Sequence, residues 1–177
     1  MVRHGEAAAG YNEHPDPGLS GLGRNQARAV AELLGPLGPL PIVSSPMARA
    51  RETAAPLAEL WQQPVAIEPA VSEIPSPSLT PAQRGPWLQK ISAGTWADTT
   101  DEIRRWRDGI LAALLALDGD HMVFSHYVAI NAAISVATGS DQTHCRRLAH
   151  CAVTEFDSTG GSLRLTTSGD EGDTVVL

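Results

Sequence analysis

The chain has 177 residues, of which 42% are hydrophobic and 19% charged, and its formal net charge at pH 7 is −7. This length and composition predict a single globular domain over residues 1–177, and the negative charge argues against nucleic acid as a partner, because phosphate-backbone binding needs a basic surface. No apolar run approaches the about 20 residues that span a bilayer, and no charged segment followed by an apolar one marks a secretory leader, so we expect a cytoplasmic protein with no membrane partner.

The chain opens on a short strand-like pair, Met1-Val2, followed directly by Arg3, His4 and Gly5. An imidazole can attack phosphorus and carry the phosphoryl group, a guanidinium can hold its oxygens in a fork, and glycine lets the backbone turn sharply beside them. Such a triplet also occurs by chance, and a histidine at a strand end is then simply structural. The triplet therefore indicates a phosphate site only if matching residues follow it.

Strands and helices are predicted to alternate after this opening. Ser20 is expected to cap a helix that ends at Gly35, and its apolar positions near helical spacing are Leu22, Ala27, Val30, Ala31, Leu33 and Leu34. Residues 41–44 predict a short buried strand, after which Pro46 at a first helical position opens a helix to about Leu60. Strand, tight turn and helix thus recur.

The middle of the chain predicts a third strand and a long irregular stretch. Residues 65–67 are the strand, and the proline-rich residues 69–86 follow it. Long irregular segments in compact domains are more often functional than idle, so residues 69–97 are expected to face the substrate. Trp87 and Trp96 could form a lid there, but tryptophans near helices are usually core, and we favour the core.

The second half predicts a helix, a strand and a further helix. Residues 98–117 form an amphipathic pattern with one apolar face made of Ile103, Trp106, Ile110, Leu114 and Leu117. Residues 121–125 predict a buried strand that ends at His126, where an apolar helix begins. The alternation of strands and helices predicts an α/β fold, a three-layer sandwich with a mostly parallel central sheet and helices on both faces.

The end of the chain predicts a hairpin and a loose tail. Residues 152–156 and 162–166 read as two strands, and the glycine-containing residues 157–161 between them are a turn signal. Residues 168–177 are expected to be loosely held.

Three of the predicted strands deliver residues suited to phosphate at their carboxyl ends. Arg3 and His4 follow the first strand, Arg49 lies one turn into the helix after the second, and His126 follows the strand at residues 121–125. Ligands of open α/β sheets bind at this edge, so the three segments could converge on one anion. A locally basic pocket is compatible with an acidic protein, because short-range arginine contacts outweigh a screened global field.

The two cysteines do not predict a metal site. Cys145 and Cys151 each follow a histidine, but the spacing fits no common zinc pattern, and we expect reduced thiols. The histidines that match no motif are expected to be structural or exposed: His14, His121, His144 and His150.

Taken together, these motifs resemble those of the histidine phosphatase superfamily, also called the phosphoglycerate mutase-like family. The resemblance covers nearly the whole chain. Residues 3–6 (Arg-His-Gly-Glu) match the defining motif, residues 16–27 the entrance to the first helix, residues 44–54 the second arginine segment, and residues 125–126 the second histidine.

The resemblance implies a phosphomonoester hydrolase that needs neither a cofactor nor a metal. His4 is implied to be the nucleophile, with one ring nitrogen free and the other held by a backbone acceptor. Arg3 and Arg49 are implied to grip the phosphoryl oxygens, and His126 to donate a further hydrogen bond to them. Arg51 faces differently from Arg49 on the same helix, and we expect it at the surface or in a salt bridge.

The leaving alcohol needs a proton, and water later needs a base, so one carboxyl group with a raised pKa can serve both steps. Glu73 occupies the region where the family commonly places this acid, and the alternatives are Glu68, Asp98 and Asp101. Another branch of the superfamily puts an aspartate directly after the second histidine. This chain has Tyr127 there, which excludes that branch and is expected to narrow the pocket or contact substrate.

Two departures from the family pattern stand near the start of the chain. Only Met1 and Val2 precede Arg3, so the first strand is expected to be short, as if truncated, and to pair poorly. Gly10 stands where many relatives carry an asparagine that contacts phosphate, and Asn12 nearby is given no role.

Several functions stay open beside hydrolysis of a small phosphorylated metabolite. A protein phosphohistidine phosphatase fits the chain length and would act on a phosphoprotein, but such short relatives usually lack the acid. A phosphoglycerate mutase-type phosphotransferase is disfavoured because those relatives are longer. A non-catalytic phospholigand-binding module is disfavoured because binding alone needs no nucleophilic histidine.

Overall fold

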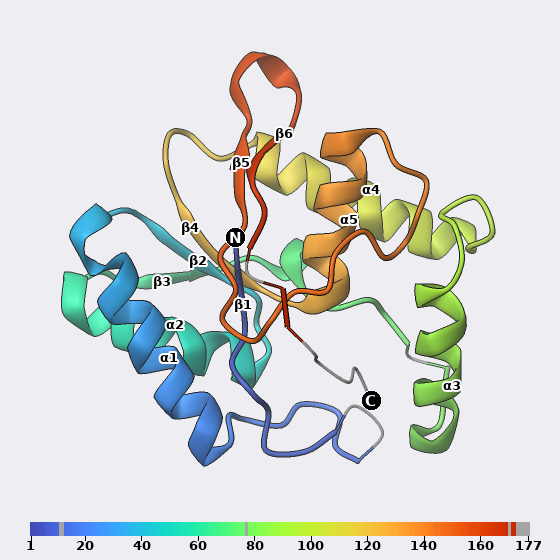
Figure 1. Cartoon of the computed structure of the whole chain (residues 1–177), viewed down its shortest axis with the longest axis horizontal. Helices are drawn as coiled ribbons and strands as arrows, with labels where there is room; N and C mark the ends of the chain where they lie inside the picture. Colours follow the sequence, from blue (N-terminus) through green and yellow to red (C-terminus); the bar gives the residue numbers. More distant parts are fainter. Residues whose placement is uncertain (11–12, 77, 170, 173–177) are drawn as a thin grey trace.

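A four-stranded parallel sheet forms the centre of the computed structural model, which describes residues 1–10, 13–76, 78–169 and 171–172 (Figure 1). The spatial order of the strands is β1-β4-β2-β3. Their bounds are Val2–Arg3 for β1, Ile42–Ser44 for β2, Val65–Ile67 for β3 and Met122–Ser125 for β4. All four strands therefore end at the same edge.

Helices cover both faces of this sheet (Figure 1). Helices α1 and α2 pack on one face, and α4 and α5 pack on the other, with α3 at the side. The bounds of the helices are Gly21–Leu34 (α1), Ala48–Trp61 (α2), Pro81–Ser92 (α3), Asp101–Leu115 (α4) and Tyr127–Thr138 (α5). Short 3-10 turns lie at Gly35–Leu37, Pro69–Val71 and Thr159–Gly161.

Alternation along the strands divides the core in two. Ile42 and Phe124 pack with the residues of α1 and α2, whereas their chain neighbours Val43 and Val123 pack with those of α4 and α5. Successive side chains of a strand point to opposite faces, so strands that are buried throughout need a helical layer on each side. The predicted α/β sandwich is confirmed.

Strand β1 is as short as expected, but it pairs on both sides. Val2 and Arg3 lie opposite Phe124 and Ser125 of β4. On its other side Val2 bridges Val153 in antiparallel fashion, and Thr154 exchanges hydrogen bonds with Met1 at 2.5 and 2.8 Å. The prediction of poor pairing is wrong, because a returning antiparallel segment supplies the missing partner.

The predicted hairpin near the end of the chain is confirmed with small shifts. Strand β5 (Glu155–Asp157) pairs antiparallel with β6 (Arg164–Thr167). Gly160 and Gly161 in the turn have φ values of 74° and 75°, which glycine adopts without a steric penalty. Of the expected loose tail, Glu171 bridges Leu148, while residues 170 and 173–177 lie outside the described residues.

Helix α1 is capped as predicted but buries a different face. The Ser20 side chain accepts a hydrogen bond from the Gly23 amide. Leu22 and Leu33 are 53% and 69% exposed, so their assignment to the apolar face is wrong. The positions that face the core are Gly23, Ala27, Val30, Ala31 and Leu34.

Two further sequence predictions need correction. Pro46 is not the first residue of α2, because the helix begins at Ala48 with Met47 as its N-cap. The chain bends before the helix, and the Met47 amide donates to the Ser45 hydroxyl. The irregular stretch is interrupted by α3 from Pro81 onward.

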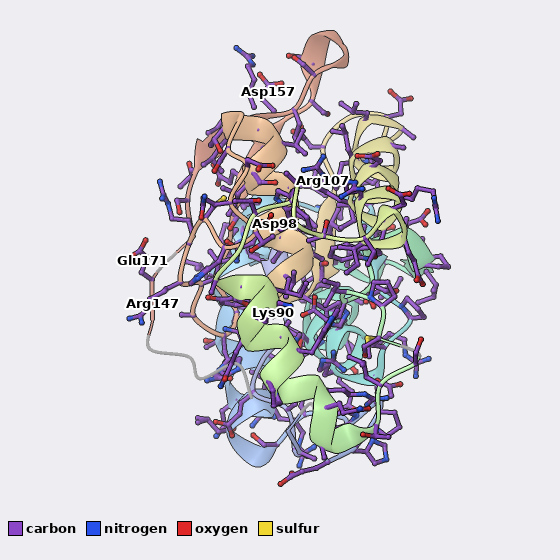
Figure 2. All side chains as sticks on the ribbon, turned by 90° about the vertical axis from the view of Figure 1, so that its right-hand side faces the viewer. Lys90, Asp98, Arg107, Arg147, Asp157 and Glu171 are labelled. Carbon is purple, nitrogen blue, oxygen red and sulfur yellow. The ribbon has the colours of Figure 1, made fainter. Side chains whose placement is uncertain are left out.

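Trp96 lies in the core as expected, and the half-buried Trp87 packs against it. Trp96 is 1% exposed and Trp87 packs against the same cluster, so the preference for core over lid is confirmed. Arg107 of α4 covers the Trp96 ring at 5.1 Å, and Figure 2 shows Arg107 close to the segment that carries Asp98.

None of the described helices is both long and apolar enough to cross a membrane.

Candidate active site

The carboxyl edge of the sheet brings Arg3, His4, Arg49 and His126 together, although they are far apart in the sequence. The ring centroids of His4 and His126 lie 5.1 Å apart, and Arg49 Nε donates to His4 Nε2 at 3.2 Å. Each of the four side chains is at most 7% exposed. The structure therefore places two cations and two imidazoles in one buried cluster.

The ring of His4 is held in one tautomer. Its Nδ1 lies 2.7 Å from the Gly5 carbonyl oxygen and donates to it, while Nε2 accepts from Arg49. Burial lowers the pKa of His4 well below its usual value, and the nearby His126, Arg49 and Arg3 lower this pKa further. His4 is thus a neutral imidazole whose Nε2 lone pair points at a guanidinium.

The loop after His4 is fixed by contacts with both α1 and α2. The Gly5 amide donates to Thr53 Oγ1 at 3.0 Å, and the Ser20 hydroxyl donates to Glu6 Oε1 at 2.6 Å. A Cβ atom on Gly23 would lie 2.0 Å from the Glu6 carbonyl oxygen. Only glycine at position 23 allows the loop to approach the helix this closely.

Arg49 is positioned by the first turn of α2. The Asp16 carboxylate accepts from the Ala48 amide at 2.8 Å and lies 3.8 Å from Arg49 Nη1. A carboxylate at a helix N-terminus satisfies a free amide and is favoured by the helix dipole. Arg51, two positions on, is exposed as predicted.

Arg3 is held between a backbone carbonyl and an aromatic ring. Its Nη1 donates to the Leu148 carbonyl at 2.6 Å, and its guanidinium lies 4.8 Å from the centre of the Tyr127 ring. Burial lowers the pKa of Arg3 to about 10, so it stays charged at neutral pH. Tyr127 is itself buried and its hydroxyl lies 2.7 Å from His144 Nε2. Tyr127 orients Arg3 here, and its contact with substrate stays a prediction.

His126 caps α5 and is fully buried. Its Nε2 lies 2.8 Å from the Ser45 hydroxyl, and its Nδ1 has no partner among the described residues. Burial lowers the pKa of His126 well below its usual value, and Arg49 and Arg3 lower it further. A neutral imidazole with an unpaired nitrogen retains one position for a ligand.

Glu73 reaches the same cluster, whereas the alternative carboxyls bond elsewhere. Its two oxygens accept from the Ile74 amide at 3.0 Å and from the Val128 amide of α5 at 3.4 Å. Burial raises the pKa of Glu73, and the charges of Arg49 and Arg3 partly offset the rise. The other candidates bond to local partners: Glu68 to the Ala70 amide, Asp98 to the Thr95 hydroxyl and Asp101 to Arg104.

Comparison with known proteins shows the family of this chain. The model of the histidine phosphatase superfamily (branch 1) matches residues 1–171. The chain belongs to the histidine phosphatase superfamily. A probable phosphoglycerate mutase GpmB of Serratia proteamaculans is 28% identical over 89% of this chain and 83% of its own length. A glucosyl-3-phosphoglycerate phosphatase of Mycolicibacterium vanbaalenii is 43% identical over 77 residues, and the match spans 34% of that relative's length.

Solved structures of the superfamily share the whole fold. A mycobacterial glucosyl-3-phosphoglycerate phosphatase in complex with VO3 has a TM-score of 0.73 and 27% identity, covering 95% of this chain and 96% of that one. A phosphoserine phosphatase of Entamoeba histolytica in complex with 3-phosphoglyceric acid has a TM-score of 0.72 and 22% identity, covering 96% and 94% of the two chains. The second likeness shows the fold alone.

Two further residues that were not predicted as site residues also lie in the cluster. Ser45 bonds to His126, and its place directly after β2, at the edge where ligands bind, was a usable signal. His150 lies beside His4, with 6.2 Å between ring centroids, although the sequence suggested a structural or exposed residue. His150 directly precedes the segment that pairs antiparallel with β1. Because that segment runs in the opposite direction to β1, its first residues lie at the carboxyl edge of the sheet.

The His-Cys pairs of residues 144–151 do not converge on a metal. Within the described ranges, no group of three or more His, Cys, Asp or Glu side chains could hold a metal ion. Cys145 and Cys151 are free thiols, and burial raises the pKa of Cys151 to about 12.

Proposed function

We propose that this protein is a phosphomonoester hydrolase that works through a phosphohistidine on His4. The observation that carries the proposal is the tautomer of His4, whose Nδ1 proton is held by the Gly5 carbonyl so that the Nε2 lone pair faces Arg49. A nucleophile must present a lone pair where the phosphoryl group is bound. A protein that only binds a phosphorylated ligand does not need a nucleophilic histidine.

The first step transfers the phosphoryl group to the enzyme. His4 Nε2 attacks phosphorus, the bond from phosphorus to the ester oxygen breaks, and the leaving oxygen takes the proton of Glu73. Arg3 and Arg49 stabilise the charge on the three peripheral oxygens, and His126 donates to one of them through a ring N–H. The raised pKa of Glu73 keeps a proton available for this step.

The second step returns the enzyme to its starting state. Glu73, now ionised, takes a proton from water, whose oxygen attacks the phosphohistidine. The bond from phosphorus to nitrogen breaks, the electron pair returns to His4 Nε2, and inorganic phosphate leaves. No metal is part of either step, because the two arginines supply the positive charge.

Small phosphorylated metabolites are the proposed substrates. Relatives of the same superfamily are named for phosphatases of glucosyl-3-phosphoglycerate and phosphoserine, which are esters of alcohols. An alcohol leaving group needs a general acid. Glu73 can supply the proton, because it lies close enough to Arg3 and Arg49 for their charges to influence its pKa. A protein phosphohistidine substrate has less need of such an acid.

The likeness to a probable phosphoglycerate mutase makes phosphotransfer the second candidate. The two reactions differ in the acceptor, since a hydrolase passes the phosphoryl group to water. Release of inorganic phosphate in step with loss of 3-phosphoglycerate supports the hydrolase, and formation of 2-phosphoglycerate without phosphate release supports the mutase.

Hydrolysis of a chromogenic aryl phosphate in excess chelator tests the proposal. Wild type should release phosphate, and His4→Ala should lose activity by about 1,000-fold or more because the nucleophile is gone. His121→Ala is the matched control, since this histidine lies before β4 at the opposite edge of the sheet. Full activity in His4→Ala would overturn the proposal. A wild type that binds phosphate without hydrolysing any ester would make the protein a binding module.

A further inference from the structure

A third imidazole, that of His150, stands beside the nucleophile. Its ring centroid lies 6.2 Å from that of His4, with 43° between the ring planes. The side chain is half-buried, so it borders the cluster rather than filling the core. Among the described residues, no side chain donates to or accepts from the His150 ring.

The turn that carries His150 is clamped to Arg3 at both ends. Arg3 Nη1 donates to the Leu148 carbonyl at 2.6 Å, and the Arg3 amide donates to the Ala152 carbonyl at 3.1 Å. Gly172 donates to the Arg147 carbonyl, and Figure 2 shows Arg147 and Glu171 close together at this end of the turn. The position of His150 therefore depends on Arg3, which belongs to the buried cluster around His4.

The backbone next to His150 is held in an unfavourable conformation. Cys151 has φ = 58°, in the left-handed region that residues with a Cβ rarely adopt. Such residues persist only where the surroundings fix them, and they cluster at functional sites. The contacts to Arg3 provide that fixation here and aim the preceding side chain toward His4.

The separation of the two rings suits a bound phosphate. The Nε2 lone pair of His4 faces phosphorus at about 3–3.5 Å, and a hydrogen bond to oxygen is about 2.8 Å long. With 6.2 Å between the ring centroids, an oxygen of that phosphoryl group can therefore lie within hydrogen-bond reach of His150. Burial and, to a lesser extent, the charge of Arg3 lower the pKa of His150 to about 4, and Glu6 opposes the change. The neutral ring at pH 7 has one N–H that can donate to an anion.

We propose that His150 is a substrate-binding residue that hydrogen-bonds an oxygen of the bound phosphomonoester and sets its affinity. The inference rests on the proposed phosphatase site, of which it would be a fifth phosphate contact beside Arg3, His4, Arg49 and His126. Its contribution is to binding, because His150 takes part in neither bond change.

Two substitutions at His150 separate hydrogen bonding from packing. His150→Phe keeps an aromatic ring of similar size but removes both nitrogens, whereas His150→Gln keeps an N–H donor at similar reach. The dissociation constant for inorganic phosphate, measured by calorimetry, should rise about tenfold in His150→Phe and stay within about threefold in His150→Gln. With an aryl phosphate, KM should follow the same pattern while kcat changes less than about threefold.

The control is His121→Phe, which makes the same change at the opposite edge of the sheet and should leave phosphate binding unchanged. Thermal unfolding of each variant checks that the fold is retained. Equal phosphate affinity in wild type and His150→Phe, equal loss in His150→Phe and His150→Gln, or no phosphate binding by wild type would each overturn the inference.

The binding measurement also separates this inference from the proposed function. If wild type binds phosphate tenfold better than His150→Phe but hydrolyses no ester, His150 is a ligand of a non-catalytic site and the hydrolase proposal fails. If wild type hydrolyses esters and His150→Phe binds phosphate equally well, the hydrolase proposal holds and the role of His150 fails.

Discussion

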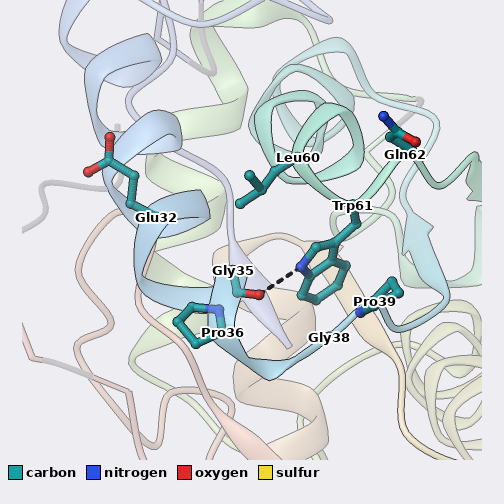
Figure 3. A pocket seen from close by; sticks show the side chains of 8 residues that line it. All are labelled: Glu32, Gly35, Pro36, Gly38, Pro39, Leu60, Trp61 and Gln62. Atoms are coloured by element: carbon teal, nitrogen blue, oxygen red, sulfur yellow. Dashed lines mark hydrogen bonds between the residues drawn. The ribbon is translucent and has the colours of Figure 1, made fainter.

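The two edges of the parallel sheet differ in what they expose. At the carboxyl edge, buried arginines and neutral histidines gather around His4. At the opposite edge, the connections from α1 to β2 and from α2 to β3 line an open hollow of about 600 Å³, which Leu60, Trp61, Pro36 and Pro39 border (Figure 3). Among the described residues, no cluster of charges lines this hollow, and Leu60 in its lining is 57% exposed.

The comparison shows that the volume of a hollow does not identify the candidate active site. Burying an arginine or a histidine costs free energy unless partners compensate, so a cluster of such groups is a stronger functional signal than empty space. The Trp61 indole of the hollow donates to the Gly35 carbonyl at 2.9 Å, which is a structural contact between two helix ends. Substitutions at the two edges should therefore have different effects.

The largest effect is expected for Arg49→Ala. Removing the guanidinium takes away charge that the transition state needs and the donor to His4, so kcat/KM for an aryl phosphate should fall about 1,000-fold. Arg49→Lys should recover little, because lysine cannot present a planar fork. Arg51→Ala on the same helix is the control and should keep wild-type kinetics. Equal losses in the Arg49 and Arg51 variants would contradict the assignment.

Glu73→Gln should affect alkyl esters most. We expect kcat/KM, which reports the first step, to fall about 100-fold for an alkyl phosphate and far less for an aryl phosphate, whose leaving group needs less protonation. Because burial raises the pKa of Glu73, its acid form persists to higher pH than in an exposed glutamate, and activity on alkyl esters falls as pH rises through that pKa. The variant should lack this fall. Equal slowing of both esters would remove Glu73 from the acid role.

Gly23→Ala should disturb the His4 loop through packing alone. The added methyl group meets the Glu6 carbonyl at 2.0 Å, so the loop must shift, and we expect a loss of about 2 kcal/mol in the free energy of unfolding and roughly a tenfold loss of kcat/KM. Gly21→Ala, where a Cβ meets nothing within 4 Å, should not destabilise the protein. Urea unfolding and aryl phosphate kinetics measure both variants. Wild-type behaviour of Gly23→Ala would contradict the close approach.

The smallest effect is expected in the hollow. Trp61→Phe removes the donor to the Gly35 carbonyl and should lower the free energy of unfolding by about 1 kcal/mol without changing kcat/KM. A loss of activity comparable to that of the Gly23 variant would show that the two edges are not independent.

The part of the site at strand ends could be predicted from the sequence. Arg3 ends a short apolar strand, and Arg49 and His126 follow two others. Parallel strands carry such residues to one edge whatever their separation in the chain. His150 was not predicted to be part of the site, because it precedes a strand segment rather than following one. A hydrophobic pattern does not tell whether a segment runs parallel or antiparallel to its neighbour. The antiparallel bridge from Val2 to Val153 decides this point.

The errors in the helices have similar causes. Helix α3 contains Pro81 and Pro86 and buries Leu88 without an apolar stripe, so its composition reads as a loop. In α1, Leu33 matches helical spacing yet is exposed, while the smaller Ala27 and Ala31 are buried, and the helix packs against α2. Close helix packing selects small side chains, which a count of apolar positions does not capture.

Trapping of the phosphoenzyme tests the role of His4 most directly. In Glu73→Gln with an aryl phosphate, the first step needs little acid while the second lacks its base, so the intermediate should accumulate. After an alkaline quench, mass spectrometry should find one phosphoryl group on the peptide that contains His4, and none in the same variant with His4→Ala added. Continued release of phosphate with no phosphoryl group on that peptide, or a phosphoryl group on another residue, would contradict nucleophilic catalysis by His4.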